Sequence, residues 1–309
     1  MHQGLESLPI IGEDSVASLL GWAPLIDALE IAMMQFSAGE VAQPVRQIVP
    51  VPGRDGVIAA MPAVGEAMAV KIVTLYHSNA GTEIPTHQGV ILVFDKDNGS
   101  PLALMDGRLI TEMRTAAGSA AAVRRLAVES PEVVTILGSG VQARAHAHAI
   151  AEVRDGYELR LWARSSDRGR ELADEIGAVF VDDPEAAVRD ADIVACTTAS
   201  TEPILAGAWL EPGAFVTAVG WNTPDGRELD DDAMANTVIV ESVDAARDQA
   251  GNVRGSACDI FAEIGEIYAG TKVVSPGATV VFDSIGLAIM DVAAASLVYA
   301  AWQAATTGT

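Results

Sequence analysis

A glycine-rich turn in the middle of the chain carries the sharpest chemical signal in the sequence. The segment Thr135–Ala143 reads TILGSGVQA and combines the end of an apolar run with a GxGxxA pattern. In such a pattern the first glycine permits a tight turn, the second lets the backbone approach a pyrophosphate, and the alanine allows close helix packing. We predict that this turn binds a dinucleotide through Gly138, Gly140, Val141 and Gln142, at a helix N-terminus that supplies free N–H donors. The alternative is a plain tight turn between a strand and a helix.

The identity of the dinucleotide depends on the residues that end the next strand. An enzyme that prefers NAD commonly has an acidic residue there for the adenosine ribose. This chain instead reads WARSS from Trp162. Arg164 and Ser165 could bind a 2′-phosphate, because guanidinium groups pair well with phosphate oxygens. The sequence therefore favours NADP(H) over NAD(H), and the alternative is that Arg164 is a solvated loop residue.

Three cationic residues in the first part of the chain lie at unusual positions. Arg46 lies where a strand begins, Lys71 interrupts an apolar strand, and Arg114 lies near the start of a helix. Taken singly, each is more often a solvent-facing charge, and a lysine on a strand commonly prevents edge pairing. His87 is either a pocket residue or a histidine that is hydrogen-bonded within a turn.

The order of apolar segments predicts two domains. Short alternating segments such as 67–76 and 89–94 are separated by turns and indicate a sheet-rich first part. An alanine-rich helix over 111–128 follows. Beyond it, strands at 133–137, 159–162 and 193–197 are separated by helical stretches, which is typical of a parallel sheet with right-handed crossovers.

We therefore predict an α/β protein with a Rossmann-type doubly wound parallel sheet in residues 125–287. Residues 1–124 are predicted to form a discontinuous, sheet-rich α+β domain for substrate binding and dimerisation, which an amphipathic C-terminal helix in 288–309 completes. Thr198 and Ser200 directly follow the strand 193–197. The crevice at the strand ends would present both hydroxyl groups to the cofactor.

The composition excludes several classes of function. The chain has 42 acidic and 19 basic residues, a net charge of -23, and no basic tract, so nucleic acid is a poor candidate partner. No apolar run approaches the roughly 20 residues of a membrane-spanning helix, and the N-terminus lacks the pattern of a signal peptide. We therefore expect a cytoplasmic protein that does not bind membranes. Cys196 and Cys258 show no metal-ligand spacing, so no metal site is expected.

A series of short blocks extends over almost the whole chain. The blocks are KIV from Lys71, PTHQG from Pro85, LMDGRLIT from Leu104, RTAA from Arg114 with Ser119, the turn at Gly138, ADIV from Ala191, STEP from Ser200, PGA from Pro212, AVG from Ala218 with RELD from Arg227, and FDSIGLA from Phe282. In this order the blocks resemble the ornithine cyclodeaminase and mu-crystallin family.

The resemblance implies a clamp for the carboxylate of a small amino or imino acid. In the family, the positions that match Arg46, Lys71 and Arg114 are associated with binding this carboxylate beside the nicotinamide. Two guanidinium forks and one ammonium suit that task. Lys71 could also donate a proton to a substrate nitrogen if burial and the arginines lower its pKa. The family's nicotinamide contacts map onto Val219, Gly220 and Ser284, to which we add Thr115.

One departure from the family's pattern affects the expected reaction. Cyclodeaminases have an aspartate just after the Val-Gly pair, where it accepts a proton from the amine that cyclises, whereas this chain has Asn222. Asparagine cannot act as a base, although it can hydrogen-bond substrate or cofactor in the catalytic site. We therefore expect an NAD(P)H-dependent oxidoreductase that reduces a small cyclic imino acid of the Δ1-pyrroline-2-carboxylate type. An ornithine cyclodeaminase, an alanine dehydrogenase-like enzyme and a noncatalytic NADP-dependent binding protein stay open.

The resemblance also implies a homodimer. In the family the first domain pairs with its copy through sheet edges. Such pairing would cover strands that are otherwise exposed.

Overall fold

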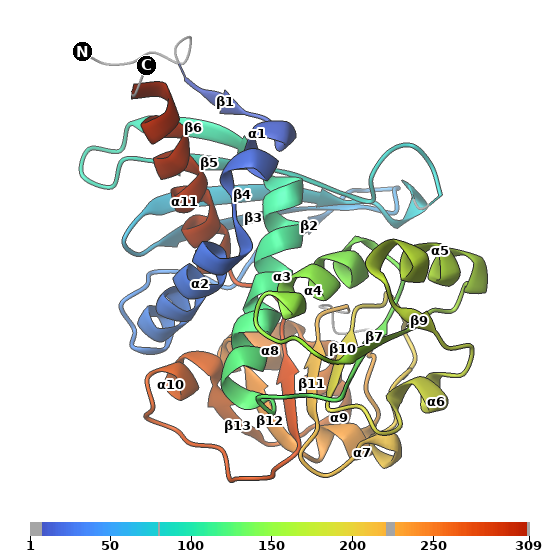
Figure 1. The fold of residues 1–309 in the computed structure, drawn as a ribbon. Coiled ribbons are helices and arrows are strands. Elements are labelled where there is room, and N and C mark those ends of the chain that lie inside the picture. The colour runs from blue at the N-terminus through green and yellow to red at the C-terminus, as the bar shows by residue number, and fades with distance from the viewer. Residues whose placement is uncertain (1–7, 80, 221–225, 308–309) are drawn as a thin grey trace. The chain divides into compact units, whose positions relative to one another are not determined.

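The computed structural model describes residues 8–79, 81–220 and 226–307, and they form two compact units. Unit 1 contains the chain up to Arg114 together with the segment from Leu287, and unit 2 contains Thr115–Gly286. The first boundary falls inside helix α3 (Gly107–Leu126), and the second just precedes helix α11 (Ala288–Thr307) (Figure 1). Which unit binds substrate and which binds cofactor stays a prediction.

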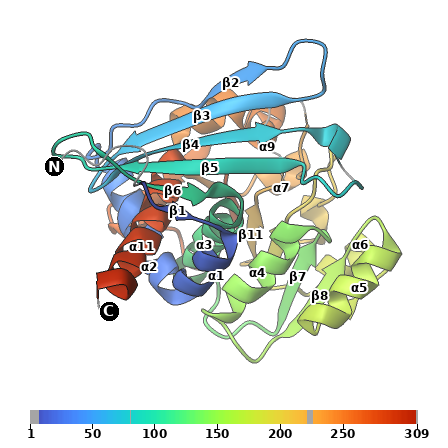
Figure 2. The same ribbon diagram turned by 90° about the horizontal axis from the view of Figure 1, so that it is seen from above.

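Unit 1 is a six-stranded sheet with helices on one face. Its further elements are β1 (Ile10–Ile11), α1 (Glu13–Leu19), α2 (Trp22–Ser37), β2 (Gln47–Pro50), β3 (Val57–Val64), β4 (Met68–Leu75), a short 3₁₀ turn (His77–Asn79), β5 (His87–Phe94) and β6 (Pro101–Asp106). The strand order is β1-β6-β5-β4-β3-β2, antiparallel from β2 to β6. Helix α11 packs on β3, β4 and β5, and α2 packs on α11, as Figure 2 shows. The predicted sheet-rich α+β architecture is confirmed.

The alternation of side chains in β4 places Lys71 on the covered face of this sheet. Lys71 pairs in register with Met61 of β3 and Ile91 of β5, and all three side chains are buried. Apolar neighbours solvate an ammonium group poorly, so a lysine at this position needs a compensating partner. The fold has to supply that partner from the helices above the sheet.

The helices depart from the sequence prediction in three places. The helices α1 and α2 were not predicted, because short alternating segments dominate the surrounding sequence. Helix α3 begins at Gly107, not at 111, because the Asp106 carboxylate accepts a hydrogen bond from the N–H of Leu109 at 2.9 Å and caps the helix. Helix α11 is not amphipathic at its start, where residues 288–292 are all buried.

Helix α11 also corrects the expectation that no apolar run is long enough to cross a membrane. Residues 288–306 pass that test by length and composition, and the bent pair α1 and α2 passes it jointly. However, α11 packs against α2 and the strands of unit 1, and a core helix of a folded domain has the same composition. We interpret it as the core helix of unit 1.

Unit 2 is an eight-stranded parallel sheet with flanking helices, and it confirms the predicted Rossmann-type fold. Its elements are β7 (Val133–Leu137), α4 (Val141–Ala151), β8 (Glu158–Trp162), α5 (Ser166–Ile176), β9 (Val179–Phe180), α6 (Pro184–Val188), β10 (Ile193–Cys196), a 3₁₀ turn (Gly207–Trp209), β11 (Phe215–Ala218), α7 (Asp231–Met234), β12 (Thr237–Val240), α8 (Val243–Gln249), α9 (Gly251–Ser256), β13 (Ile260–Glu263), α10 (Ile264–Tyr268) and β14 (Val280–Asp283).

The strand order of unit 2 fixes where a ligand can bind. The order is β13-β12-β14-β11-β10-β7-β8-β9, so the chain starts in the middle at β7 and winds outward in both directions. Ligands of such sheets bind at the carboxyl ends of the strands, at the switch point between β7 and β10. The last strand, β14, lies between β11 and β12, which brings the residues after it to the same edge.

Candidate active site

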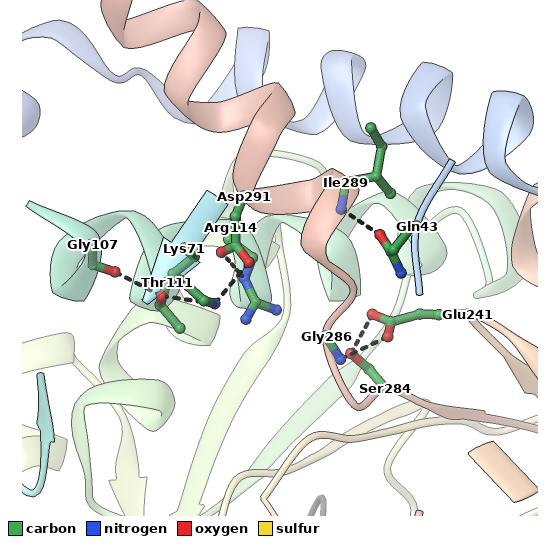
Figure 3. A network of polar contacts seen from close by, with 10 residues as sticks. All are labelled: Gln43, Lys71, Gly107, Thr111, Arg114, Glu241, Ser284, Gly286, Ile289 and Asp291. Atoms are coloured by element: carbon green, nitrogen blue, oxygen red, sulfur yellow. Dashed lines mark hydrogen bonds and ion pairs between the residues drawn. The ribbon is translucent and has the colours of Figure 1, made fainter. Parts of the chain in front are cut away.

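A buried ion-pair cluster in unit 1 joins two of the three predicted cationic residues. The Nζ atom of Lys71 lies 2.7 Å from Oδ2 of Asp291, and Nε of Arg114 donates to Oδ1 of the same carboxylate at 3.0 Å. The Lys71 and Asp291 side chains are only 1% and 2% exposed. Figure 3 shows the three groups meeting where α11 passes above β4 and α3.

The hydroxyl of Thr111 completes the surroundings of Lys71. Nζ donates to Thr111 Oγ1 at 3.3 Å, and this hydroxyl donates in turn to the carbonyl of Gly107 at 2.6 Å. Thr111 and Arg114 are three residues apart on α3 and therefore share one side of the helix. The unpredicted start of α3 at Gly107 thus sets the position of both residues above the sheet.

The surroundings of Lys71 lower its pKa to about 7. Burial is the main cause, and the positive charges of Arg114 and Arg46 add to it, whereas Asp291 opposes the shift. Arg46 is therefore close enough to act on Lys71 electrostatically, so the three predicted cations share one region of unit 1. We call Arg46, Lys71 and Arg114 the cationic cluster.

Asp291 supplies one negative charge to the two buried cations that it contacts, Lys71 and Arg114. Burial raises the pKa of this carboxylate, but the charges of Arg114 and Lys71 outweigh the effect of burial and hold the pKa below its usual range. Within the described part of the chain the terminal Nη groups of Arg114 make no hydrogen bond, and Figure 3 shows them on the side away from Asp291. An anion can therefore still bind here.

His87 lies at the start of β5 and not within a turn. It pairs with Leu75 of β4, so it lies on the same face of the sheet as Lys71. Burial and the charges of Lys71 and Arg114 lower the pKa of His87 to about 4. The imidazole is therefore neutral at physiological pH and lies within electrostatic range of the cationic cluster.

Asp291 was missed by the sequence reasoning. It lies 177 residues after Arg114 in the chain, and only the fold returns α11 to the first sheet. A signal was nonetheless present, because Asp291 is the only charged residue in 288–309. A single acidic residue inside an apolar helix requires a buried partner, and here Lys71 and Arg114 are its partners.

The glycine turn of unit 2 has the geometry that a dinucleotide requires. Gly138 has a φ of 137°, and a Cβ there would overlap the Thr197 side chain after β10. Gly140 is the N-cap of α4, and a Cβ at this position would meet no atom within 4 Å. The side-chain oxygen of Gln142 is buried and has no hydrogen-bond partner. The tight turn at Gly138 and the open space at Gly140 fit a bound pyrophosphate, whose oxygens accept from N–H groups at the helix N-terminus, whereas the Gln142 oxygen is itself an acceptor.

The residues after β8 form a positively charged turn at the start of α5. Ser165 is the N-cap of α5, but its side chain makes no capping hydrogen bond. Arg164 is exposed, and so is Arg168 in the first turn of α5. Neither arginine forms an ion pair in the described ranges of the chain. Arg168 was not predicted.

The strand ends of unit 2 bring the other predicted cofactor residues to one edge of the sheet. Thr198 follows β10, Val219 and Gly220 follow β11, and Ser284 follows β14, while these strands are hydrogen-bonded neighbours. The Ser200 hydroxyl donates to the carbonyl of Glu202 at 2.7 Å in its own loop. Thr115 is buried in α3, and Asn222 lies outside the described residues.

Two buried glutamates behind these loops were also missed. Glu228 accepts hydrogen bonds from the backbone and hydroxyl of Thr198 and from the N–H of Gly220. Glu241 accepts hydrogen bonds from the Ser284 hydroxyl and from the N–H groups of the two residues that follow it. Glu228 lies in the RELD block quoted for the family resemblance but was assigned no role, and Glu241 lies in none of the quoted blocks.

The sequence matches the Ornithine cyclodeaminase/mu-crystallin family over residues 11–306. The chain belongs to this family. The ketimine reductase mu-crystallin of Mus musculus is 43% identical over 287 residues, which cover 90% of this chain and 92% of that protein. The Delta(1)-pyrroline-2-carboxylate reductase of Bacillus cereus is 33% identical over 94% of this chain and 95% of its own length. The predicted family is therefore confirmed.

Two solved structures have the same fold. The Delta(1)-pyrroline-2-carboxylate reductase of Thermococcus litoralis, in complex with NADH and L-proline, matches with a TM-score of 0.90 and 30% identity, covering 98% of this chain and 99% of that chain. An archaeal alanine dehydrogenase dimer with bound NAD matches with a TM-score of 0.90 and 27% identity, over 98% and 97% of the two chains.

Proposed function

We propose that this protein is an NAD(P)H-dependent reductase of small cyclic imino acids, which it converts to the corresponding amino acids. The observation that carries the proposal is the buried cluster of Lys71, Arg114 and Asp291, in which positive charge exceeds negative charge. A buried excess charge is costly unless a ligand of opposite sign binds. A carboxylate is the complement that this geometry favours.

The terminal nitrogens of the Arg114 guanidinium are suited to a carboxylate. Its Nε is fixed by Asp291, so the planar fork is held in one orientation while the terminal nitrogens are available. A guanidinium fork can donate two parallel hydrogen bonds to one carboxylate. We assign this contact to Arg114 and a further electrostatic contribution to Arg46, which would together hold the substrate by its carboxylate.

Lys71 is assigned the proton transfer. Reduction of an imine adds a hydride to carbon and a proton to nitrogen. When bound, the dihydronicotinamide supplies the hydride. The ammonium form of Lys71 holds the proton at Nζ, and a pKa of about 7 makes it a better donor than an ordinary lysine. A bound carboxylate would raise this pKa and so favour the charged form when substrate is present.

The cofactor preference for NADP(H) is part of the proposal. It is supported by the two exposed arginines, Arg164 and Arg168, and by the Ser165 hydroxyl without a capping bond, at the place where the adenosine ribose binds in this fold. The double variant Arg164→Ala and Arg168→Ala should raise KM for NADPH about tenfold or more and leave KM for NADH within about twofold. Arg170→Ala is the matched control because Arg170 already pairs with Asp182. Equal effects on both cofactors would argue against this assignment.

A homodimer is also proposed, with the exposed face of the unit 1 sheet as its interface, whereas the family resemblance had implied pairing through sheet edges. Ile58, Ile72 and Val90 lie on this face and are 41 to 42% exposed. Apolar side chains gathered on one sheet face typically mark a protein interface. Ile72→Glu should convert a dimer into a monomer in sedimentation experiments, whereas Ile84→Glu, in an exposed loop, should not. A wild-type monomer would refute the proposal.

A cytoplasmic location is also part of the proposed function.

A substrate panel with both cofactors tests the reaction. Wild-type protein should oxidise NADPH in the presence of Δ1-pyrroline-2-carboxylate or Δ1-piperideine-2-carboxylate and release no ammonia from ornithine. Lys71→Met should lower kcat at least about a hundredfold, in the range of general acid catalysis, while retaining NADPH binding. Ammonia release from ornithine would instead identify a cyclodeaminase. Cofactor binding without turnover of any imino or amino acid would identify a binding protein.

A further inference from the structure

The acid Glu228 lies directly behind the strand ends that face the cofactor crevice. Its Oε1 accepts hydrogen bonds from the N–H and the hydroxyl of Thr198 at 2.6 and 2.7 Å, and its Oε2 accepts one from the N–H of Gly220 at 2.8 Å. The residue is fully buried. One carboxylate therefore joins the loop after β10 to the loop after β11.

The packing around Gly220 shows how closely these loops approach one another. A Cβ at Gly220 would overlap the carbonyl oxygen of Thr198 and the carboxylate of Glu228. The backbone N–H groups of Glu228 and Leu229 both donate to Oδ1 of Asn252, at 2.9 and 3.1 Å, which anchors the acid from behind. Glu228 is thus held rigidly between a buried amide and two loops.

A second buried glutamate repeats the arrangement on the neighbouring strands. Glu241 follows β12, accepts a hydrogen bond from the hydroxyl of Ser284 at 2.6 Å and receives the N–H of Gly286 at 2.7 Å. Figure 3 shows this carboxylate facing the turn after β14. The loops after β10 and β11 are therefore bound to Glu228, and the loop after β14 is bound to Glu241.

We propose that Glu228 and Glu241 are positioning residues that shape the nicotinamide half of the cofactor site. Neither glutamate takes the role of the aspartate that cyclodeaminases have at the position of Asn222. Both glutamates are buried, and their oxygens already accept hydrogen bonds from the loops. In a doubly wound sheet the adenosine half binds over β7 and β8, and the nicotinamide half over β10 and β11. Glu228 and Glu241 therefore position only the loops that would contact the nicotinamide half.

The two glutamates also orient the hydroxyl groups of Thr198 and Ser284. Each donates its only proton to a glutamate, so toward a ligand each presents an oxygen lone pair as acceptor. A ligand that offers N–H donors at this position, as the carboxamide of nicotinamide does, fits this polarity. The inference rests on the proposed cofactor-dependent reduction.

The test compares NADPH with 2′,5′-ADP, a fragment that lacks the nicotinamide half. Glu228→Gln keeps the size of the side chain but turns an NH₂ toward buried donors, and leaving such a donor unsatisfied should weaken NADPH binding roughly tenfold or more. Binding of 2′,5′-ADP should stay within about twofold. Glu241→Gln is a second variant with the same expectation, which carries the test if Glu228→Gln fails to fold.

The matched control lies at the opposite edge of the same sheet. Asp192 bridges the N–H groups of Glu132 and Val133 at 2.6 and 3.1 Å, at the amino ends of β7 and β10. Asp192→Asn should lower the melting temperature without changing the affinity for either ligand. Unchanged NADPH binding in the glutamine variants, or equal weakening of both ligands, would overturn the inference. Imine reduction by the wild-type protein, measured separately, tests the proposed function itself.

Discussion

Removing the carboxylate of Asp291 is the perturbation from which most can be learned about the candidate active site. Asp291→Asn preserves the shape of the side chain but deletes the one carboxylate that, among the described residues, forms ion pairs with Lys71 and Arg114. At 2.7 Å and an effective dielectric constant of about 20, the attraction between Asp291 and Lys71 is about 6 kcal/mol. Desolvation of both groups offsets part of it, and loss of one partner from a buried pair typically costs about 3 to 5 kcal/mol of stability.

The sign of the effect on Lys71 follows from the charges around it. Asp291 raises the pKa of Lys71, and burial, Arg114 and Arg46 lower it to about 7. Without Asp291 the pKa falls further, so less of the ammonium form exists at any given pH. A shift of the alkaline limb by one pH unit, equivalent to about 1.4 kcal/mol, would lower the ammonium fraction at pH 7.5 roughly eightfold.

The assay is the pH dependence of kcat/KM for reduction of Δ1-pyrroline-2-carboxylate by NADPH, which reports ionisations of the free enzyme and substrate. Wild-type activity should fall as the pH rises through about 7, and in Asp291→Asn this limb should move at least about one pH unit lower. Substrate ionisation is common to both proteins and cancels in the comparison. Asp95→Asn, in the turn between β5 and β6, is the control and should show no shift.

Two results would refute this reasoning. One is an alkaline limb that stays in place or moves to higher pH in Asp291→Asn. The other concerns stability: because the variant leaves Lys71 and Arg114 uncompensated, adding Lys71→Met to it should restore part of the lost stability. A double variant that is less stable than Asp291→Asn would show that the buried charges are not coupled as the geometry indicates.

Three further predictions concern single side chains. Arg114→Lys keeps the charge but loses the planar fork, so kcat/KM for the imino acid should fall about tenfold or more, and an effect under about twofold would contradict the assigned contact. Gly138→Ala should abolish NADPH binding and lower the melting temperature, because of the positive φ and the overlap with Thr197, whereas Gly140→Ala should fold normally, as thermal denaturation can show. Burial raises the pKa of Asp283 to about 7, so this group favours the folded state at low pH and loses that contribution as the pH rises from about 4 through 7. Asp283→Asn should therefore lessen the decline of the melting temperature over that range, and an unchanged slope would contradict the shift.

Much of unit 2 could be predicted from the sequence because its signals are local. The turn at Gly138 is specified by residues within a few positions of one another, and the apolar strands that alternate with helices determine a doubly wound sheet. The three cations were identified by their unusual positions and by the family resemblance. By contrast, the start of α3 at Gly107 depends on the single cap at Asp106, which a periodic pattern does not reveal.

The sequence by itself determined the family, the glycine turn after the first strand of unit 2 and the residue types that could bind a carboxylate. The tertiary structure decided which partners these residues contact and how their pKa values shift. Asp291 meets Lys71 only because α11 returns to the first sheet after the whole of unit 2, and Glu228 meets Thr198 and Gly220 only because β10 and β11 are neighbours in the sheet. Desolvation and Coulomb interactions depend on distance in space and not along the chain, so only the folded arrangement sets the pKa of Lys71.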